Sequence, residues 1–162
     1  MSRVTVGILV AVVLAASACG SGRHTSFSTF SDVCGLSVPT PSGFHRTFWN
    51  DAGRGGVTIE DGRIGPGTGN PVKWSDDPDR VALAVGGNSG RNPGGLAASP
   101  TRLQLPITLD ELAQGSGGLP YWSGGGEVGG EQCGVAVWLG PKAPAVDRAA
   151  VLDALQATKE SP

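Results

Sequence analysis

Glycine and proline interrupt this chain so often that long regular elements cannot form. The 162 residues include 27 Gly and 12 Pro, about twice the combined share of roughly 12% that is usual in proteins. Gly loses much conformational freedom on folding, and Pro lacks a backbone N–H. We therefore expect short elements joined by long Gly/Pro-rich loops. The absence of a regular Gly-X-Y repeat excludes a collagen triple helix.

Charge and motifs exclude several functional classes. The chain has 12 Lys+Arg against 14 Asp+Glu, a net charge of −2, whereas nucleic-acid binding needs a strong excess of basic residues. It has no Gly-Lys pair for a phosphate-binding loop and no Gly-x-Ser-x-Gly element. A zinc site needs three or four protein ligands. The two histidines, His24 and His45, are too few to form one together with the other potential ligands of the chain. We expect no nucleic-acid partner, cofactor or metal, and we assign no catalytic residue.

The first 18 residues have the pattern of an export signal. Arg3 is the only charge before an apolar run from Val4 to Leu14, which ends in small residues up to Ala18. Even counted through Ala18, a helix of this stretch would cover roughly 22 Å, less than the ~30 Å of a bilayer core. We expect a signal peptide over 1–18, a flexible tether over 19–31 and a single extracytoplasmic domain over 32–162.

The end of this segment resembles the lipobox of bacterial lipoproteins, because small residues lead into Cys19 and Gly-Ser-Gly follows. The resemblance implies cleavage before Cys19, a diacylglyceryl group on its thiol and palmitate-type acylation of its amine. The protein would then be anchored by lipid on the extracytoplasmic face of the cell membrane. Ala16 stands where the lipobox usually has Leu, and Ala16–Ser17–Ala18 also fits an ordinary secretory cleavage site. A secreted soluble domain is therefore the alternative.

Three cysteines leave an odd one in an exported protein. If lipid takes Cys19, then Cys34 and Cys133 remain, and each precedes Gly and a β-prone run. Export places them where disulfides persist, so we expect a disulfide that joins the first and last major strands near their starts. The alternative of a catalytic thiol needs a nearby base, and only His45 lies outside the tether.

The hydrophobic pattern predicts an α+β fold: a small, mostly antiparallel sheet with a C-terminal helix packed on it. A Thr108–Glu111 capping box predicts a short helix that ends at Gly115, and a second helix is expected from Pro144 or Ala145 to Thr158. A turn at Asp61–Gly62 should lead into the residues that follow it. The expected strands are 36–38, 44–49, 57–60, 63–64, 80–85, 102–106 and 135–139.

Two segments carry further resemblances. The ending from Val137 to Leu152 is similar to C-terminal segments of small lipoproteins from high-GC Gram-positive bacteria. The opening from Leu36 to Phe44 resembles the start of the Mog1/PsbP-like sandwich, a likeness that implies no functional residue.

Aromatic residues are the candidate ligand contacts. Tyr121 and Trp122 lie between Leu119–Pro120 and a Gly run, where we expect a loop, and Trp74 is a third candidate. Exposed aromatic rings stack on sugars or anchor a partner, although such rings can also fold back over a small core. The acidic run 75–79 offers oxygen ligands for Ca²⁺, but Asp76 or Asp77 can equally form a turn.

Together these features predict a lipid-anchored cell-envelope protein that binds or scaffolds an envelope protein or glycan. An envelope enzyme with an unrecognised active site is the competing class, which a pocket with His45 beside Asp or Ser would favour. An exposed apolar patch around Trp122 would favour a partner surface.

Overall fold

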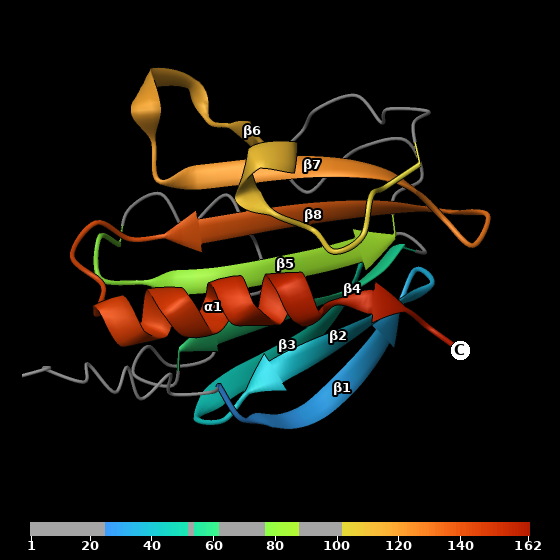
Figure 1. Cartoon of the computed structure of the whole chain (residues 1–162), viewed down its shortest axis with the longest axis horizontal. Coiled ribbons are helices and arrows are strands. Elements are labelled where there is room, and N and C mark those ends of the chain that lie inside the picture. The colour runs from blue at the N-terminus through green and yellow to red at the C-terminus, as the bar shows by residue number, and fades with distance from the viewer. Residues whose placement is uncertain (1–24, 52–53, 62–76, 88–101) are drawn as a thin grey trace, which may run out of the picture.

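A computed structural model of the chain describes residues 25–51, 54–61, 77–87 and 102–162 (Figure 1). Within these ranges nine strands form two antiparallel sheets, and a single α-helix follows the last long strand, so the fold is α+β as predicted. The expected single sheet is instead a six-stranded sheet, β3-β4-β5-β8-β7-β6, and a three-stranded sheet, β1-β2-β9. The elements are β1 (Phe27–Val33), β2 (Leu36–Pro41), β3 (Phe44–Asp51), β4 (Arg54–Asp61), β5 (Val81–Gly87), β6 (Ala113–Gln114), β7 (Tyr121–Val128), β8 (Glu131–Leu139), α1 (Ala145–Ala157) and β9 (Lys159–Glu160).

The helix and the small sheet share one face of the large sheet (Figure 1). Helix α1 contacts both β2 and β5. Directly after the helix, β9 pairs with the start of β2, where Leu36 lies opposite Glu160. The chain end therefore ties the helix to the small sheet, and one core forms between these elements and the large sheet.

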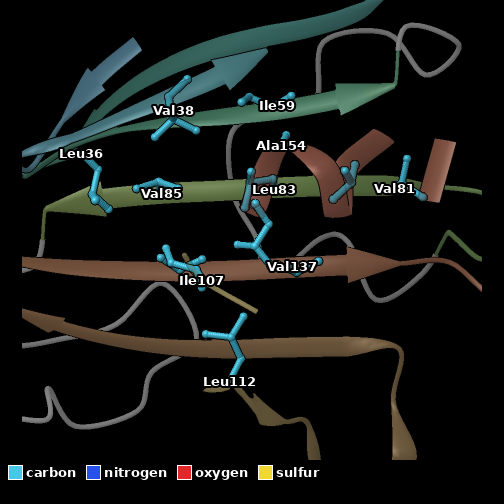
Figure 2. Close-up of a cluster of buried hydrophobic side chains, with 14 of the residues drawn as sticks. Leu36, Val38, Ile59, Val81, Leu83, Val85, Ile107, Leu112, Val137 and Ala154 are labelled. Atoms are coloured by element: carbon cyan, nitrogen blue, oxygen red, sulfur yellow. The ribbon is translucent and has the colours of Figure 1, made fainter. Parts of the chain in front are cut away.

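The core is built from the alternate residues of the two central strands, β5 and β8, together with β2 and α1 (Figure 2). Burying one Leu or Val side chain contributes about 1.5–3 kcal/mol. Of the predicted apolar face of the helix, Val151 and Leu155 are buried and Leu152 is partly buried, while Ala154 is also buried. The other core residues include Leu36, Val38, Val81, Leu83, Val85, Cys133, Val135 and Val137.

Five predicted strands, 36–38, 44–49, 57–60, 80–85 and 135–139, coincide with β2, β3, β4, β5 and β8. Strand β2 continues to Pro41, beyond the predicted end at residue 38, and so includes Pro39. The pairing explains this, because β9 reaches only Leu36 and Ser37 of β2. Beyond Ser37 the strand has one neighbour, and a proline is tolerated where no second strand needs its N–H. The predicted turn at Asp61–Gly62 and strand 63–64 extend outside the described residues.

Residues 27–31 of the predicted tether are ordered, because they belong to β1, which pairs along β2. The strands are joined by Cys34 and Gly35 with φ values of +45° and +76°. Two consecutive positive φ values are typical of the type I′ turn, whose twist matches that of a hairpin. The folded domain therefore starts earlier than the predicted residue 32.

Two predictions between residues 102 and 115 are wrong. Arg102 makes an isolated bridge with Glu127 in place of a strand over 102–106. The helix predicted from Thr108 is a single 3-10 turn, Leu109–Glu111, in which the Thr108 N–H donates to the Glu111 carboxylate at 3.4 Å. It ends because Ala113 and Gln114 pair with β7 as β6, and sheet pairing outweighs local helix preference here.

Candidate functional site

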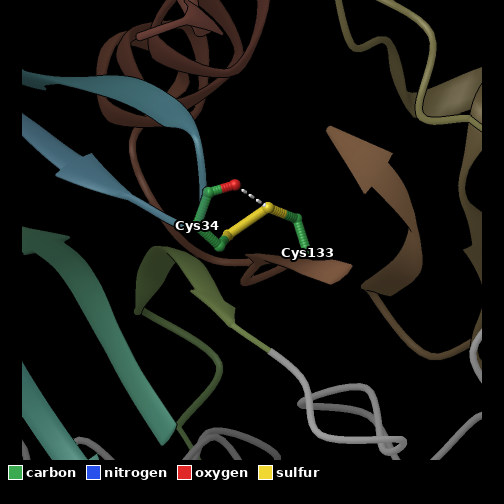
Figure 3. Close-up of a disulfide and its surroundings, with 2 residues drawn as sticks. All are labelled: Cys34 and Cys133. Carbon is green, nitrogen blue, oxygen red and sulfur yellow. Dashed lines mark hydrogen bonds between the residues drawn. A yellow bond between two sulfur atoms is a disulfide. The ribbon is translucent and has the colours of Figure 1, made fainter. Parts of the chain in front are cut away.

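The predicted disulfide is present between Cys34 and Cys133 (Figure 3). Their Cα atoms lie 5.6 Å apart, and the two residues are separated by 99 positions. Cys34 lies in the turn before β2, and Cys133 is the third residue of β8 and only 2% exposed. The bond thus joins the small sheet to the large one, near the starts of the two strands as expected. It also takes both thiols, so neither is a free nucleophile.

The expected loop position of Tyr121 and Trp122 is wrong, because both residues belong to β7. Consecutive strand residues point to opposite faces of a sheet. Accordingly, Trp122 packs against the main core, and Tyr121 packs against a second cluster formed by Ala82, Ala84, Ala136 and Trp138. The two rings do not form one joint surface. Ligand binding at either ring stays a prediction, and Trp74 lies outside the described residues.

Tyr121 is held in partly buried, mostly apolar surroundings. Its ring centroid lies 6.5 Å from that of Trp138, whose indole N–H donates to the Asp77 carbonyl at 3.3 Å. Burial raises the pKa of the Tyr121 hydroxyl, and a hydrogen bond with Ser123 acts in the opposite direction. The hydroxyl therefore stays protonated at neutral pH.

A buried ion pair lies on the same face of the large sheet as Tyr121. The Arg80 guanidinium donates to Glu60 Oε2, and the two side chains are 7% and 2% exposed. Within the described ranges, Glu60 Oε1, Arg80 Nε and the Thr58 hydroxyl have no hydrogen-bond partner. Unsatisfied buried polar atoms are costly. A polar group that supplies both a donor and an acceptor would satisfy the two charged side chains.

Farther along this sheet face, glycines on β4 and β5 lie beneath the ring of Trp49. Gly56 on β4 lies opposite Gly86 on β5 and Trp49 on β3. A Cβ at Gly56 would lie 2.1 Å from the Trp49 ring, and one at Gly86 would lie 2.5 Å from it. The glycines are therefore required for the indole ring to lie flat over the strands.

The residues weighed for catalysis and metal binding show no such arrangement in the described ranges. His45 lies opposite Glu60 on the outer strand β3 and is exposed. The Asp77 carboxylate accepts a hydrogen bond from the Asp79 N–H at 3.0 Å, which supports its expected role in a turn. The described residues hold no group of three or more potential metal ligands, and Asp76 and Cys19 lie outside them.

A shallow groove of about 480 Å³ lies at the other end of β7, lined by Arg102, Glu127, Gly129, Gly130 and Glu160. Arg102 and Glu160 form an ion pair at 2.9 Å, with side chains that are 78% and 47% exposed. Exposed pairs of this kind contribute little energy. The groove brings together none of the predicted ligand residues.

Sequence reasoning missed the Glu60–Arg80 pair for a clear reason. The alternation in Val57–Glu60 looks like that of a strand with one solvated face, which gives no sign that Glu60 is buried.

No protein-family model, curated protein or solved structure gives a significant match to this chain. None of the helices in the described ranges is long and apolar enough to span a membrane.

Proposed function

We propose that this protein is anchored by lipid on Cys19 at the extracytoplasmic face of the cell membrane, where it binds or scaffolds an envelope protein or glycan. The Cys34–Cys133 disulfide carries the proposal. Disulfides persist in oxidising compartments outside the cytoplasm. The bond takes two of the three cysteines, and the third, Cys19, follows the apolar run and its small residues.

The start of the folded domain supports a position close to the membrane. Strand β1 begins at Phe27, so residues 20–26 separate it from Cys19. Seven residues span at most roughly 25 Å when fully extended. A lipid on Cys19 would therefore keep the domain within a short distance of the headgroups.

The aromatic residues of β7 support binding as the role of the domain, because both are only partly buried. Tyr121 and Trp122 stay the predicted aromatic contacts, each on its own face of the sheet.

Cell fractionation of a Cys19→Ala variant tests the anchor. We expect the natural protein to remain with membranes through a high-salt wash and to be released by detergent, because two acyl chains suffice for stable anchoring. The Cys19→Ala protein should lose the salt-resistant association, and a Ser21→Ala control should keep it. Unchanged association of the Cys19→Ala protein, or recovery of the natural protein in the medium as a secreted domain, would contradict the anchor.

Photo-crosslinking in intact cells tests the binding role. A photoreactive residue in place of exposed Gln114, which pairs with Trp122, should give adducts with an envelope protein or glycan. The same residue in place of exposed Ala149 on α1 is the matched control. Equal labelling from both positions, or none from either, would count against a binding surface beside Trp122.

A further inference from the structure

Two exposed phenylalanines stand out on the surface of the described residues. Phe30 on β1 is 52% exposed and Phe48 on β3 is 60% exposed. Together with Arg46 on β3 and Lys159 on β9 they form what we call the Phe–cation patch. The other large exposed apolar residues in the described ranges, Leu119 and Val146, are not among these contacts.

Contacts of the two cations connect the residues of the patch. The Arg46 guanidinium lies 5.5 Å from the centroid of the Phe48 ring. The same group donates to the Phe30 carbonyl at 3.5 Å and to the Ser31 hydroxyl at 3.4 Å. Lys159 Nζ lies 5.9 Å from the centroid of the Phe30 ring. Each aromatic ring therefore has a cation over its face, and Arg46 connects the two pairs through the backbone of β1 and the Ser31 hydroxyl.

The two phenylalanines of the patch lie on edge strands of the two sheets. β1 is the outer strand of the small sheet, and β3 is the outer strand of the large sheet (Figure 1). Outer strands leave backbone N–H and C=O groups unpaired and are usually protected by charge or by a cover. Exposed aromatic rings on these two strands are a liability in free solution, which points to a surface that is covered in the cell.

We propose that the Phe–cation patch rests on the surface of the membrane, with its rings at the headgroup boundary and its two cations against anionic lipid phosphates. Aromatic side chains favour this boundary, and Lys and Arg near an anionic surface are attracted to it. The inference rests on the proposed lipid anchor at Cys19. It adds an orientation, in which the outer strands β1 and β3 face the bilayer.

The chain geometry allows this orientation. Phe30 lies three residues into β1, which is about 10 Å along a strand, and the chain from Cys19 to Phe27 can span roughly 25 Å. The patch is therefore within reach of the membrane that holds the anchor.

The distribution of charge favours the same face. The chain as a whole carries a net charge of −2, so an anionic surface is expected to bind it only where cations gather. At the patch, Arg46 and Lys159 are both positive. The nearby carboxylates are Glu160, which is paired with the cation Arg102, and Asp32, which keeps its charge while it accepts a hydrogen bond from Ser161 at 3.1 Å. Cations therefore outnumber carboxylates among these five residues. An anionic membrane therefore complements the charge of this face.

Hydrogen–deuterium exchange of the lipidated protein in vesicles tests the proposal. The protein is reconstituted in phosphatidylcholine vesicles with and without phosphatidylglycerol, and exchange is followed over β1 and β3. We expect several-fold slower exchange of both strands when phosphatidylglycerol is present. Each cation neutralised, in Arg46→Gln or Lys159→Gln, should weaken this docking about fivefold.

A paired variant and a matched control separate the patch from general surface apolarity. Phe30→Ser/Phe48→Ser should remove the protection, whereas Leu119→Ser/Val146→Ser should keep it. All four positions are exposed, so both variants are expected to fold, and circular dichroism confirms this before the measurement.

Three results would overturn the proposal. Exchange of both strands could be equally fast in vesicles with and without phosphatidylglycerol. The control pair could lose protection as fully as the Phe pair. Protection without vesicles that grows with protein concentration would assign the patch to a second copy of the chain. The mass of the Cys19 peptide reports separately on the anchor. If that residue carries no lipid, sedimentation of the soluble protein with the same vesicles still tests the patch.

Discussion

Removal of the disulfide should cost this domain a large part of its stability. The double substitution Cys34→Ala/Cys133→Ala opens a loop whose ends are 99 positions apart. In the chain-entropy model, closing a loop of that length destabilises the unfolded chain by about 4.7 kcal/mol. Domains of this size have total stabilities of only ~5–15 kcal/mol. We therefore expect a loss of about 4–5 kcal/mol in the free energy of unfolding.

Urea unfolding followed by the fluorescence of the four Trp residues measures this loss. Wild-type protein with the bond reduced should behave like the double variant. A Cys34→Gly/Cys133→Ala variant should recover roughly 1 kcal/mol, because residue 34 has a φ of +45°, a conformation that strains side chains other than Gly. The wild-type protein used for comparison must carry the Cys34–Cys133 bond. A loss below about 1 kcal/mol would then refute the argument that the disulfide stabilises the domain by restricting the unfolded chain.

Three further predictions concern single residues. Glu60→Gln should destabilise the domain by about 3–5 kcal/mol, since it leaves Arg80 buried beside a neutral partner. Addition of Arg80→Met should restore much of the lost stability. A near-neutral effect of the single substitution in urea unfolding would contradict the buried pair. Gly140→Ala should cost about 1–3 kcal/mol, because its Cβ would lie 2.3 Å from the Pro78 carbonyl oxygen, whereas Gly55→Ala, which has open space, should cost less in the same assay. The only Tyr of the chain, Tyr121, has a pKa raised above 10.0 by burial. It contributes stability below pH 10 that is lost as the pH rises through its folded pKa; absorbance at 295 nm should show a higher midpoint in folded than in urea-unfolded protein, and equal midpoints would count against its burial.

The features that could be predicted from the sequence are those with local patterns. The strand 135–139 is a run of apolar residues, and helix α1 has a proline at its start and apolar residues at helical spacing. The disulfide followed from counting cysteines. Each of these depends on neighbouring residues or on a simple tally, so no knowledge of the tertiary structure was needed.

The missed elements depend on contacts between distant segments. Strand β7 contains Gly124–Gly125–Gly126, which has no strand preference of its own. It forms because it pairs along its length with β8. A Cβ at Gly124 would lie 2.8 Å from the Leu112 side chain, so the glycine is needed for packing. The same run in sequence alone is indistinguishable from a loop.

The surface and site residues were hidden for the same reason. Glu60 and Arg80 are 20 positions apart, and Arg46 reaches Phe30 across 16 positions. Phe30 itself falls in a Ser/Thr-rich stretch that has the composition of a tether. The pairing of β4 with β5 brings Glu60 and Arg80 together, and the hydrogen bonds of Arg46 to Phe30 and Ser31 bring β3 and β1 together.

The lipid anchor is the central claim, and the mass of the mature N-terminal peptide tests it most directly. Protein purified from membranes is digested, and the peptide that contains residue 19 is measured by mass spectrometry. We predict that the mature chain begins at Cys19 and that this peptide carries a diacylglyceryl group on its thiol. A mature chain that begins at any other residue, or a Cys19 with an unmodified thiol, would contradict it.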